Sequence, residues 1–291
     1  MPHPTDLKTP RIAAAVMPVS SSPSPSITTS SSDVENEDFS PLSLAEDLTP
    51  LPAYKAAGTT ETDFDGLLGG GGGPLRLRED LKNGCGGQLW PAGMTLAKYM
   101  LREHRGDLRG KSILELGAGG GLVGLAVARG CDLGEGKGEG HAPLYITDQM
   151  EMFSLMQHNI ALNGLEGRVE ALLLNWGEPL PSQVLTNPPD IILAADCVYF
   201  EPAFPLLQRT LSDLLTLQPD AVVYFCFKKR RRADMQFLKQ VRRRFCVVEI
   251  NDNEKGEGDG RPSWSREGLF MFTITAKDKD KNTEGLSEFK G

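Results

Sequence analysis

The sequence predicts an α/β fold with a mostly parallel sheet, closed by an antiparallel pair of strands near the C-terminus. Short apolar runs alternate with helical patterns through the middle of the chain, which is typical of such folds. The runs are almost continuously apolar, as expected of strands that helices cover on both faces. A glycine-rich turn follows the first run. The strands expected from these runs are 112–117, 144–148, 169–176, 190–196 and 221–227.

Helices are expected between the strands, at 91–106, 150–164 and 233–245. The first starts with a proline and places Leu96, Met100 and Leu101 at helical spacing. The second ends in Asn-Gly, a typical helix stop. The third alternates an apolar stripe with a basic face.

Composition divides the chain into one domain and two tails. The runs 246–250 and 269–275 flank an acidic, glycine-rich segment and are expected to form the closing antiparallel pair. Residues 1–73 are rich in Ser, Pro, Gly and acids and lack apolar periodicity, so we expect a disordered tail. Residues 277–291 look like a second, charged tail. The folded domain is therefore expected at 74–276.

Charge and cysteine content exclude several classes of protein. A net charge of -8 disfavours sequence-independent binding to nucleic acid, which depends on neutralising phosphates. The five cysteines form no C-x-x-C pair, so neither a disulfide framework nor a metal site is indicated. No apolar run reaches the roughly eighteen residues of a membrane span. We expect a cytoplasmic monomer; the Ser-rich N-terminus leaves a mitochondrial presequence as the competing interpretation.

The segment ILELGAGGGLVGLA carries the first functional signal. Glu115, Gly117, Gly119 and Gly121 form an E-x-G-x-G-x-G pattern between a strand and a helix. Glycines allow a tight turn and the close approach of a ligand to the backbone, and free N–H groups at a helix start favour an anion. By itself this turn fits S-adenosylmethionine, a dinucleotide such as NAD, or a purely structural turn.

Two residues at later strand ends extend this candidate ligand site. Asp148 ends the second strand, where such folds use a carboxylate to bind both ribose hydroxyls, although a helix N-cap is the alternative. Trp176 closes the third predicted strand, where an adenine would lie; it is equally compatible with an ordinary core aromatic.

The stretch NPPDIILAADCVYFEP contains two overlapping candidate signatures. Ligands of open α/β sheets bind beyond the carboxyl ends of the strands. Asp196 and Tyr199, in a D-x-x-Y pattern, follow the strand 190–196 and so belong to that edge, whereas Asn187-Pro188-Pro189 precedes the strand. We therefore expect the D-x-x-Y residues at the active site and a rigid turn at Asn187-Pro188-Pro189.

Several segments resemble family 16 of the class I methyltransferases, the small protein-lysine methyltransferases. GGQLWPAGMTLAKYM, ILELGAGGGLVGLA, ITD, LNW and LAADCVY occur in that family's order and spacing, over residues 84–275. FCFKKRRRADMQF is similar to the fungal branch that methylates translation elongation factor 1-alpha. The resemblance implies the seven-stranded, Rossmann-like class I methyltransferase fold, S-adenosylmethionine as cofactor, and the elongation factor as protein substrate.

The resemblance also implies roles for individual residues. Asp196 and Tyr199 would border the target lysine, Asp196 orienting the amine and Tyr199 lining its channel. The cofactor would be held by Trp90, Glu115, Gly117, Ala118, Gly119, Asp148, Trp176 and Ala195.

Two other functions and one further surface remain open at this stage. The alternatives to a lysine methyltransferase are an NAD-dependent oxidoreductase, for which no catalytic Tyr-Lys or His-Arg set is apparent, and a non-catalytic adaptor that binds S-adenosylmethionine. The basic residues 228–232 and 242–244 predict either a docking surface for an acidic patch on a protein substrate or a solvated face.

Overall fold

A seven-stranded sheet forms the centre of the computed structural model, which describes residues 57–69, 73–83, 85–134, 144–251 and 263–277. The strands of this sheet are β3 (Ile113–Leu116), β4 (Leu144–Asp148), β5 (Val169–Leu173), β6 (Ile191–Ala195), β7 (Val222–Lys228), β8 (Phe245–Glu249) and β9 (Leu269–Ala276). They lie in the order β5-β4-β3-β6-β7-β9-β8. The first five are parallel, and β9 runs antiparallel to both of its neighbours. This order confirms the predicted class I methyltransferase fold, including its closing antiparallel pair.

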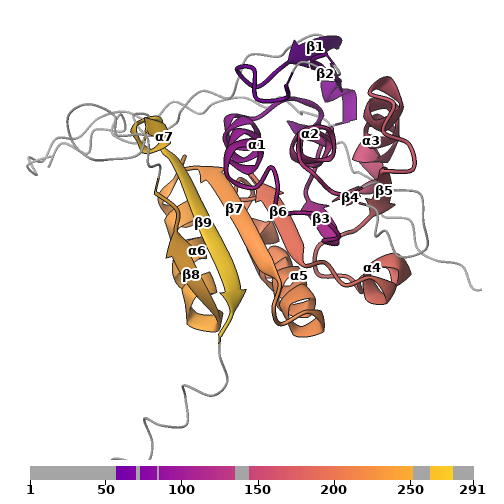
Figure 1. Ribbon diagram of the computed structural model, residues 1–291. Coiled ribbons are helices and arrows are strands. Elements are labelled where there is room, and N and C mark those ends of the chain that lie inside the picture. The colour runs from indigo at the N-terminus through magenta and orange to yellow at the C-terminus, as the bar shows by residue number, and fades with distance from the viewer. Residues whose placement is uncertain (1–56, 70–72, 84, 135–143, 252–262, 278–291) are drawn as a thin grey trace, which may run out of the picture. The chain divides into compact units, whose positions relative to one another are not determined.

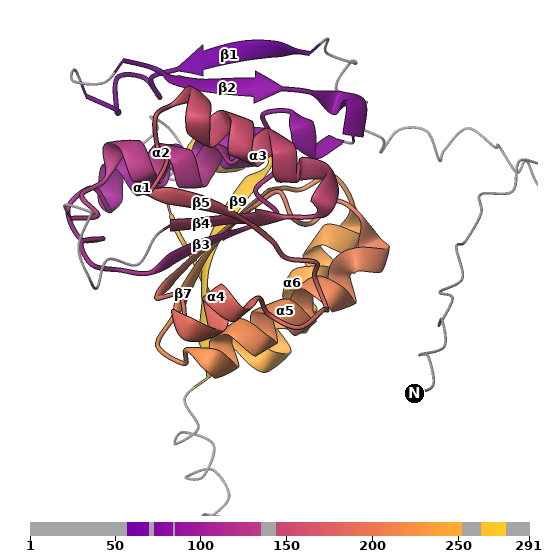
Figure 2. The same ribbon diagram turned by 90° about the vertical axis from the view of Figure 1, so that its right-hand side faces the viewer.

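Helices cover both faces of the sheet (Figure 1). They are α1 (Pro91–Glu103), α2 (Leu122–Gly130), α3 (Met150–Leu162), α4 (Ser182–Thr186), α5 (Phe204–Leu217), α6 (Arg232–Arg244) and α7 (Ser263–Arg266), with 3-10 turns at Leu81–Asn83, Cys85–Gly87 and Glu201–Ala203. Figure 2 shows α1, α2 and α3 on one face and α4, α5 and α6 on the other. Successive strand residues face opposite sides: Ile113 packs into the core under the first set and Leu114 into the core under the second.

The predicted strand 169–176 is the one whose end differs most from the structure. β5 lies at the edge of the sheet and pairs only with β4, whose last residue, Asp148, lies opposite Leu173. The last bond to β4 runs from the Leu174 N–H to the Asp148 carbonyl at 3.1 Å, and beyond it the chain turns away. Trp176 consequently lies in the loop after β5 rather than in the strand.

An N-terminal hairpin was not predicted. β1 (Gly58–Thr62) pairs antiparallel with β2 (Leu75–Glu79), and Figure 2 shows this hairpin on the outside of α2 and α3. β1 lies within the segment 1–73 assigned to a disordered tail, so that boundary is wrong at its C-terminal end. Residues 1–56, the glycine-rich segment 135–143, the segment 252–262 and residues 278–291 of the C-terminal tail lie outside the described residues.

Two asparagines, Asn159 in α3 and Asn163 at its C-cap, attach the hairpin to the domain. The Asn159 side chain accepts a hydrogen bond from the Arg78 N–H at 2.8 Å and donates to the Arg78 carbonyl at 3.2 Å. Asn163 does the same for Arg76, at 2.9 and 2.7 Å. The two side-chain amides thus bond the backbone N–H and carbonyl groups of β2 that a further strand would otherwise bond.

No helix in the described part of the chain combines the length and apolar character needed to cross a bilayer. Within the same ranges, no three His, Cys, Asp or Glu side chains gather in a way that could hold a metal ion.

Candidate active site

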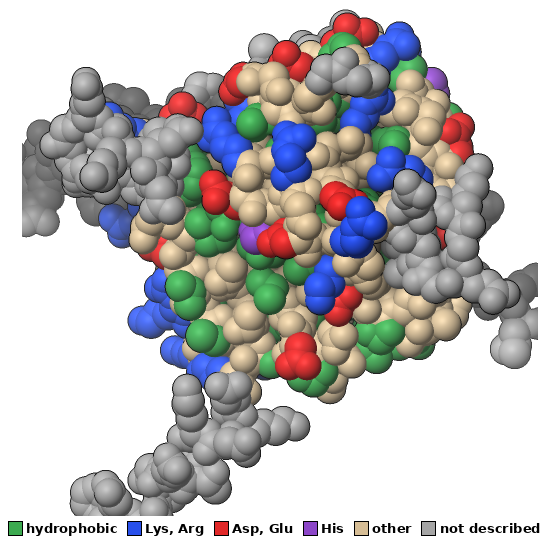
Figure 3. Space-filling model, in the orientation of Figure 1, with side chains coloured by type: hydrophobic (Ala, Val, Ile, Leu, Met, Phe, Trp, Pro, Cys, Tyr) green, Lys and Arg blue, Asp and Glu red, His purple; other side chains and the backbone are tan. Residues whose placement is uncertain are grey.

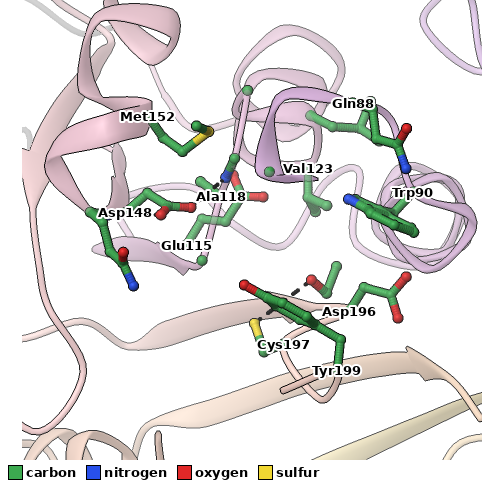
Figure 4. A pocket seen from close by; sticks show the side chains of 18 of the residues that line it. Gln88, Trp90, Glu115, Ala118, Val123, Asp148, Met152, Asp196, Cys197 and Tyr199 are labelled. Carbon is green, nitrogen blue, oxygen red and sulfur yellow. Dashed lines mark hydrogen bonds between the residues drawn. The ribbon is translucent and has the colours of Figure 1, made fainter. Parts of the chain in front are cut away.

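One cavity of about 280 Å³ opens where the parallel strands end at their carboxyl edge. Residues from the ends of three adjacent strands, β4, β3 and β6, line it together with the segment before α1. Every site residue expected from the sequence lies in its lining: Trp90, Glu115, Gly117, Ala118, Gly119, Asp148, Trp176, Ala195, Asp196 and Tyr199. In Figure 4, Asp148 and Met152 lie on one side of the cavity and Trp90, Asp196 and Tyr199 on the other.

The glycine loop between β3 and α2 has a backbone that side chains would obstruct. Gly117 and Gly119 have φ angles of 61° and 55°, in the left-handed region that favours glycine. A Cβ on Gly119 would lie 2.2 Å from the Gly86 carbonyl oxygen, and one on Gly117 would lie 2.9 Å from the Trp176 ring. The loop is therefore pressed between the segment before α1 and the Trp176 ring.

Asp148 joins the glycine loop to the second strand end. Its Oδ2 accepts a hydrogen bond from the Gly119 N–H and its Oδ1 one from the Gln149 N–H, each at 2.7 Å. Burial raises the pKa of this carboxyl. The N-cap position of α3 belongs to Gln149, so Asp148 is not the helix cap that the sequence left open. A carboxylate oxygen has two acceptor positions, and these two bonds use one on each oxygen.

Glu115 lies beneath the same loop. Its side chain is buried, and Oε2 accepts a hydrogen bond from the Gly124 N–H at 2.7 Å. Burial raises the pKa of Glu115 to about 8, against hydrogen bonds from Gly124 and Val123 that lower it. The carboxyl group therefore braces the first turn of α2 from inside.

Trp176, in the loop after β5, and Ala195, the last residue of β6, both line the cavity. The turn that carries Trp176 is fixed by a 2.8 Å hydrogen bond from the Gly177 N–H to Thr210 Oγ1 in α5. Gly177 has a φ of 80°, a conformation that suits glycine in such a turn. Ala195 ends β6, and its small side chain lines the same cavity.

The N-terminal hairpin positions Trp90. Glu79, the last residue of β2, is buried and accepts a hydrogen bond from the Leu89 N–H at 3.1 Å. The Asp80 N–H donates to the Gly87 carbonyl at 2.8 Å. The unpredicted hairpin thus supports the segment that carries Trp90 to the cavity, although it contributes none of the expected site residues.

Asp196 is held firmly, and most of its acceptor positions are occupied. Its φ of 55° is in the left-handed region, and its N–H donates to the Cys226 carbonyl at 2.8 Å. The Arg230 guanidinium contacts both carboxylate oxygens, Nη1 to Oδ1 at 2.9 Å and Nη2 to Oδ2 at 2.7 Å. The Lys228 N–H adds a bond to Oδ1 at 3.1 Å. By these bonds both acceptor positions of Oδ1 are used, whereas Oδ2 retains one.

Tyr199 borders the mouth of the cavity. It is 49% exposed and its neighbour Phe200 is 56% exposed, which is unusual for two consecutive aromatic residues. Arg231 in turn donates a hydrogen bond to the Tyr199 carbonyl. An exposed aromatic lip of this kind suits contact with a partner surface better than packing in a core.

The Asn187-Pro188-Pro189 segment lies where the sequence placed it. Asn187 follows α4 and precedes β6, and its carbonyl accepts a 3.4 Å bond from Ser112 Oγ, which precedes β3. Both positions are at the amino ends of their strands, on the edge opposite the cavity.

The lining also contains residues that the sequence did not assign to the site, among them Gln88, Val123, Met152 and Arg230. Arg230 is the most consequential, because it bonds Asp196 and lies over the Trp90 ring at 5.1 Å from the ring centroid. It was assigned to a basic surface cluster. The sequence indicates the ion pair only when two strand ends are considered together. Arg230 stands two residues beyond β7, and Asp196 follows β6, so both lie at the same edge of the sheet.

The lining fits S-adenosylmethionine. Glycine backbone leaves a cradle that a Cβ would fill, the Asp148 oxygens retain acceptor positions for hydroxyl groups, and the Trp176 ring offers a flat apolar wall. The cavity volume is close to the lower limit of the roughly 300–1,000 Å³ of small-molecule sites.

Comparisons with known proteins agree with this fit. A family model described as lysine methyltransferase matches residues 72–244. Protein-lysine N-methyltransferase EFM6 of Saccharomyces cerevisiae is 38% identical over 237 residues, which cover 76% of this chain and 92% of that protein. Protein N-lysine methyltransferase METTL21A of Danio rerio is 36% identical over 61% of this chain and 77% of its own length. EEF1A lysine methyltransferase 3 of Mus musculus is 35% identical over 50% of this chain and 57% of its own length.

These matches decide between the functions that the sequence left open. They support neither the NAD-dependent oxidoreductase nor the non-catalytic adaptor. The chain belongs to the lysine methyltransferase family and is an S-adenosylmethionine-dependent protein-lysine N-methyltransferase.

Proposed function

We propose that this chain methylates a lysine side chain of translation elongation factor 1-alpha. The observation that carries the methyltransferase part is the convergence of Asp148, Asp196 and the glycine loop on one cavity. The choice of substrate is supported by the name of the mouse relative and by the similarity of residues 225–237 to the fungal branch.

The cofactor half of the cavity is the side that holds Asp148. Each Asp148 oxygen uses one acceptor position on a backbone N–H, which leaves a matched pair of positions for two ribose hydroxyls. Trp176 and Ala195 would flank the adenine, and Gly117, Ala118 and Gly119 would lie along the cofactor. Trp90 would pack against its far end. Glu115 acts from below by fixing the turn that presents the loop.

The acceptor half is the side that holds Asp196 and Tyr199. The free acceptor position on Asp196 Oδ2 would take a hydrogen bond from the target amine and orient it. Tyr199 would line the entrance of the lysine, where a ring face tolerates a cation and its exposure leaves room for the substrate chain.

The chemistry requires a neutral amine. When bound, S-adenosylmethionine supplies a methyl group on a positively charged sulfur, which keeps the bonding electrons when the lysine nitrogen takes the methyl carbon. A free lysine has a pKa of about 10.4 and is almost entirely charged at neutral pH. The residues around the acceptor must therefore orient the nitrogen and disfavour its ammonium form, with the departing proton passing to water.

The test is transfer of isotope-labelled methyl groups by the purified full chain to recombinant elongation factor 1-alpha, with the modified lysine mapped by mass spectrometry. We expect label in one defined lysine. A parallel reaction with a cell lysate separates two failures. Label in other proteins but not in the elongation factor contradicts the proposed substrate, and no label in any protein contradicts the assignment of the site.

A further inference from the structure

Arg230 connects three parts of the acceptor half. Its guanidinium binds both oxygens of Asp196, at 2.9 and 2.7 Å, and lies 5.1 Å from the centroid of the Trp90 ring. Its side chain is 21% exposed and that of Asp196 is 5% exposed, so the ion pair is largely withdrawn from solvent. A bidentate pair that is shielded in this way has a fixed geometry, unlike a surface ion pair.

The backbone of Arg230 is fixed as well. Its N–H donates to Asp234 Oδ2 at 2.8 Å, and Asp234 is fully buried at the first turn of α6. The guanidinium also contacts the Lys228 carbonyl at 3.4 Å. Main chain and side chain are therefore both held, which fits a residue with a defined position beside the reacting groups.

We propose that Arg230 is a positioning residue that fixes the Asp196 carboxylate and, by its charge, disfavours the ammonium form of the acceptor lysine. This inference rests on the proposed role of Asp196 as the group that orients the amine. It assigns to an arginine of the basic segment a task inside the cavity rather than on the surface.

The physical need for this cation follows from the charges around the cavity. The titratable and charged groups that face it are Glu115 of β3, Asp148 of β4, Glu151 of α3, Asp196, Cys197 and Tyr199 after β6, and Arg230 after β7. Among the described residues of the lining, Arg230 is the only Lys or Arg. Cys226 and Asp234 lie behind Asp196 and Arg230 and are buried.

Without Arg230 the acceptor half would hold a lone carboxylate. A nearby negative charge stabilises an ammonium group and raises its pKa, which would keep the lysine in its unreactive form. With the guanidinium bound to it, Asp196 still offers a hydrogen-bond acceptor but little net charge. Arginine stays protonated throughout the accessible pH range, so the pairing does not change while the lysine loses its proton.

Arginine is also needed for its shape. A lysine at position 230 would keep the positive charge but contact Asp196 as a single point and lose the two-pronged geometry. Charge and geometry are therefore separable by substitution. Arg230→Gln removes the charge, and Arg230→Lys retains the charge but removes the fork.

The experiment measures single-turnover methyl transfer as a function of pH with saturating S-adenosylmethionine and protein substrate. Because substrate is already bound, the acidic limb reports the ionisation of the bound lysine. Arg230→Gln is expected to move that limb upward by about one pH unit, which lowers the rate near neutral pH about tenfold and restores it at high pH. Arg230→Lys is expected to lower the rate while leaving the limb near its wild-type position. Arg209→Gln, the same change at an exposed position of α5 outside the cavity, is the control and should match the wild type.

Each outcome is decisive for Arg230. A uniform loss across pH in Arg230→Gln, or no change at all, overturns the proposal, because a purely structural contact has no reason to move the limb. If Arg230→Gln fails to fold in a thermal melt, Arg230→Lys decides: a limb displaced despite the retained charge also overturns it. The wild-type protein tests the substrate separately. If the elongation factor is not labelled, the same comparison is made with the protein labelled in the lysate.

Discussion

The Gly119 N–H donates a 2.7 Å hydrogen bond to Oδ2 of Asp148, which ties the glycine loop after β3 to the end of β4. Two segments that are separate in the chain are thereby joined under the cavity. The carboxylate shapes the loop, and in the proposed site its remaining acceptor positions would bind the ribose, so that loop conformation and cofactor binding would depend on the same side chain.

Asp148→Ala should weaken the binding of S-adenosylmethionine at least about tenfold, because hydrogen bonds to a charged group contribute about 1.5–3 kcal/mol. Calorimetric titration of the purified chain measures this change. Glu170→Ala, which removes an exposed carboxylate from the neighbouring strand β5, is the matched control and should leave affinity unchanged. Equal affinities for wild type and Asp148→Ala would remove Asp148 from the cofactor site.

Gly119→Ala and Gly164→Ala separate backbone strain from steric obstruction. Both glycines have a positive φ, 55° and 62°, so alanine at either position should cost about 1–2 kcal/mol of folding free energy. Only at Gly119 would the new Cβ meet another group, the Gly86 carbonyl oxygen at 2.2 Å, whereas nothing lies within 4 Å at Gly164. Thermal melts and cofactor titration should show a larger loss of stability, and a loss of binding, for Gly119→Ala alone. Similar behaviour of the two variants would contradict the close packing of the loop against Gly86.

Glu115→Gln should make stability less dependent on pH. Burial raises the pKa of Glu115 from an ordinary value of 4.5 to about 8, so the folded state retains a proton that the unfolded state has lost between these values. The stability contributed by Glu115 is present below pH 4.5 and falls as pH rises to about 8, by on the order of 1 kcal/mol per pH unit. Glutamine keeps an acceptor for Gly124 but carries no charge.

Urea denaturation of the two proteins across that pH range measures the difference. The free energy of unfolding of Glu115→Gln should rise steadily relative to that of the wild type as the solution changes from acidic to mildly alkaline. A difference that stays constant with pH would show that Glu115 does not titrate in this window.

The proposed docking role of the basic residues 228–232 and 242–244 must be tested without Arg230 and Arg231. Arg230 belongs to the cavity, and Arg231 contacts Tyr199. Figure 3 shows Lys and Arg side chains along the edge formed by α6 and β8. Replacing exposed Arg232, Lys239 and Arg243 by glutamate should raise KM for the folded protein substrate several-fold, about 1 kcal/mol, and leave KM for a short lysine peptide nearly unchanged. The effect should fade at high salt. Equal changes for protein and peptide would argue for a merely solvated face.

The sheet was predictable because its strands are buried on both faces. Runs such as 144–148 and 190–196 are apolar except near their ends, and each has an observed strand at nearly the same place. β1 has the sequence GTTET, whose strand conformation depends on pairing with β2. Through β2 it also depends on Asn159 in α3 and Asn163 at the C-cap of that helix. These partners are distant in the chain, so no local sequence pattern predicts β1. β2 did carry a signal: Leu75, Leu77 and Glu79 alternate with exposed arginines and are buried.

The site residues that could be placed from the sequence are those at or directly after the end of a strand. Asp148 is the last residue of β4 and Asp196 directly follows β6, and strand direction alone places both at one edge. The orientation of Arg230 was not predictable, since it stands among consecutive basic residues, 228–232, that look alike in sequence. What selects it is the Asp196 carboxylate, whose left-handed backbone and bond to Cys226 aim it at the end of β7. That choice is made by tertiary contact.

The proposed mechanism requires that the donor half and the acceptor half of the cavity have separate tasks. Asp196→Ala should abolish most methyl transfer without weakening cofactor binding, because Asp196 lies on the acceptor side. Alanine is strained at a φ of 55°, so Asp196→Asn, which tolerates that conformation, accompanies it. Asp220→Ala, at an exposed turn before β7, controls for the loss of a carboxylate.

The most direct measurement is single-turnover transfer of labelled methyl by Asp196→Ala, with its affinity for S-adenosylmethionine determined on the same sample. We expect transfer to fall at least about a hundredfold, a barrier increase of about 2.7 kcal/mol, while affinity changes less than about threefold. Transfer at the wild-type rate, or a loss that is matched by the loss of cofactor affinity, would contradict a cavity divided between donor and acceptor.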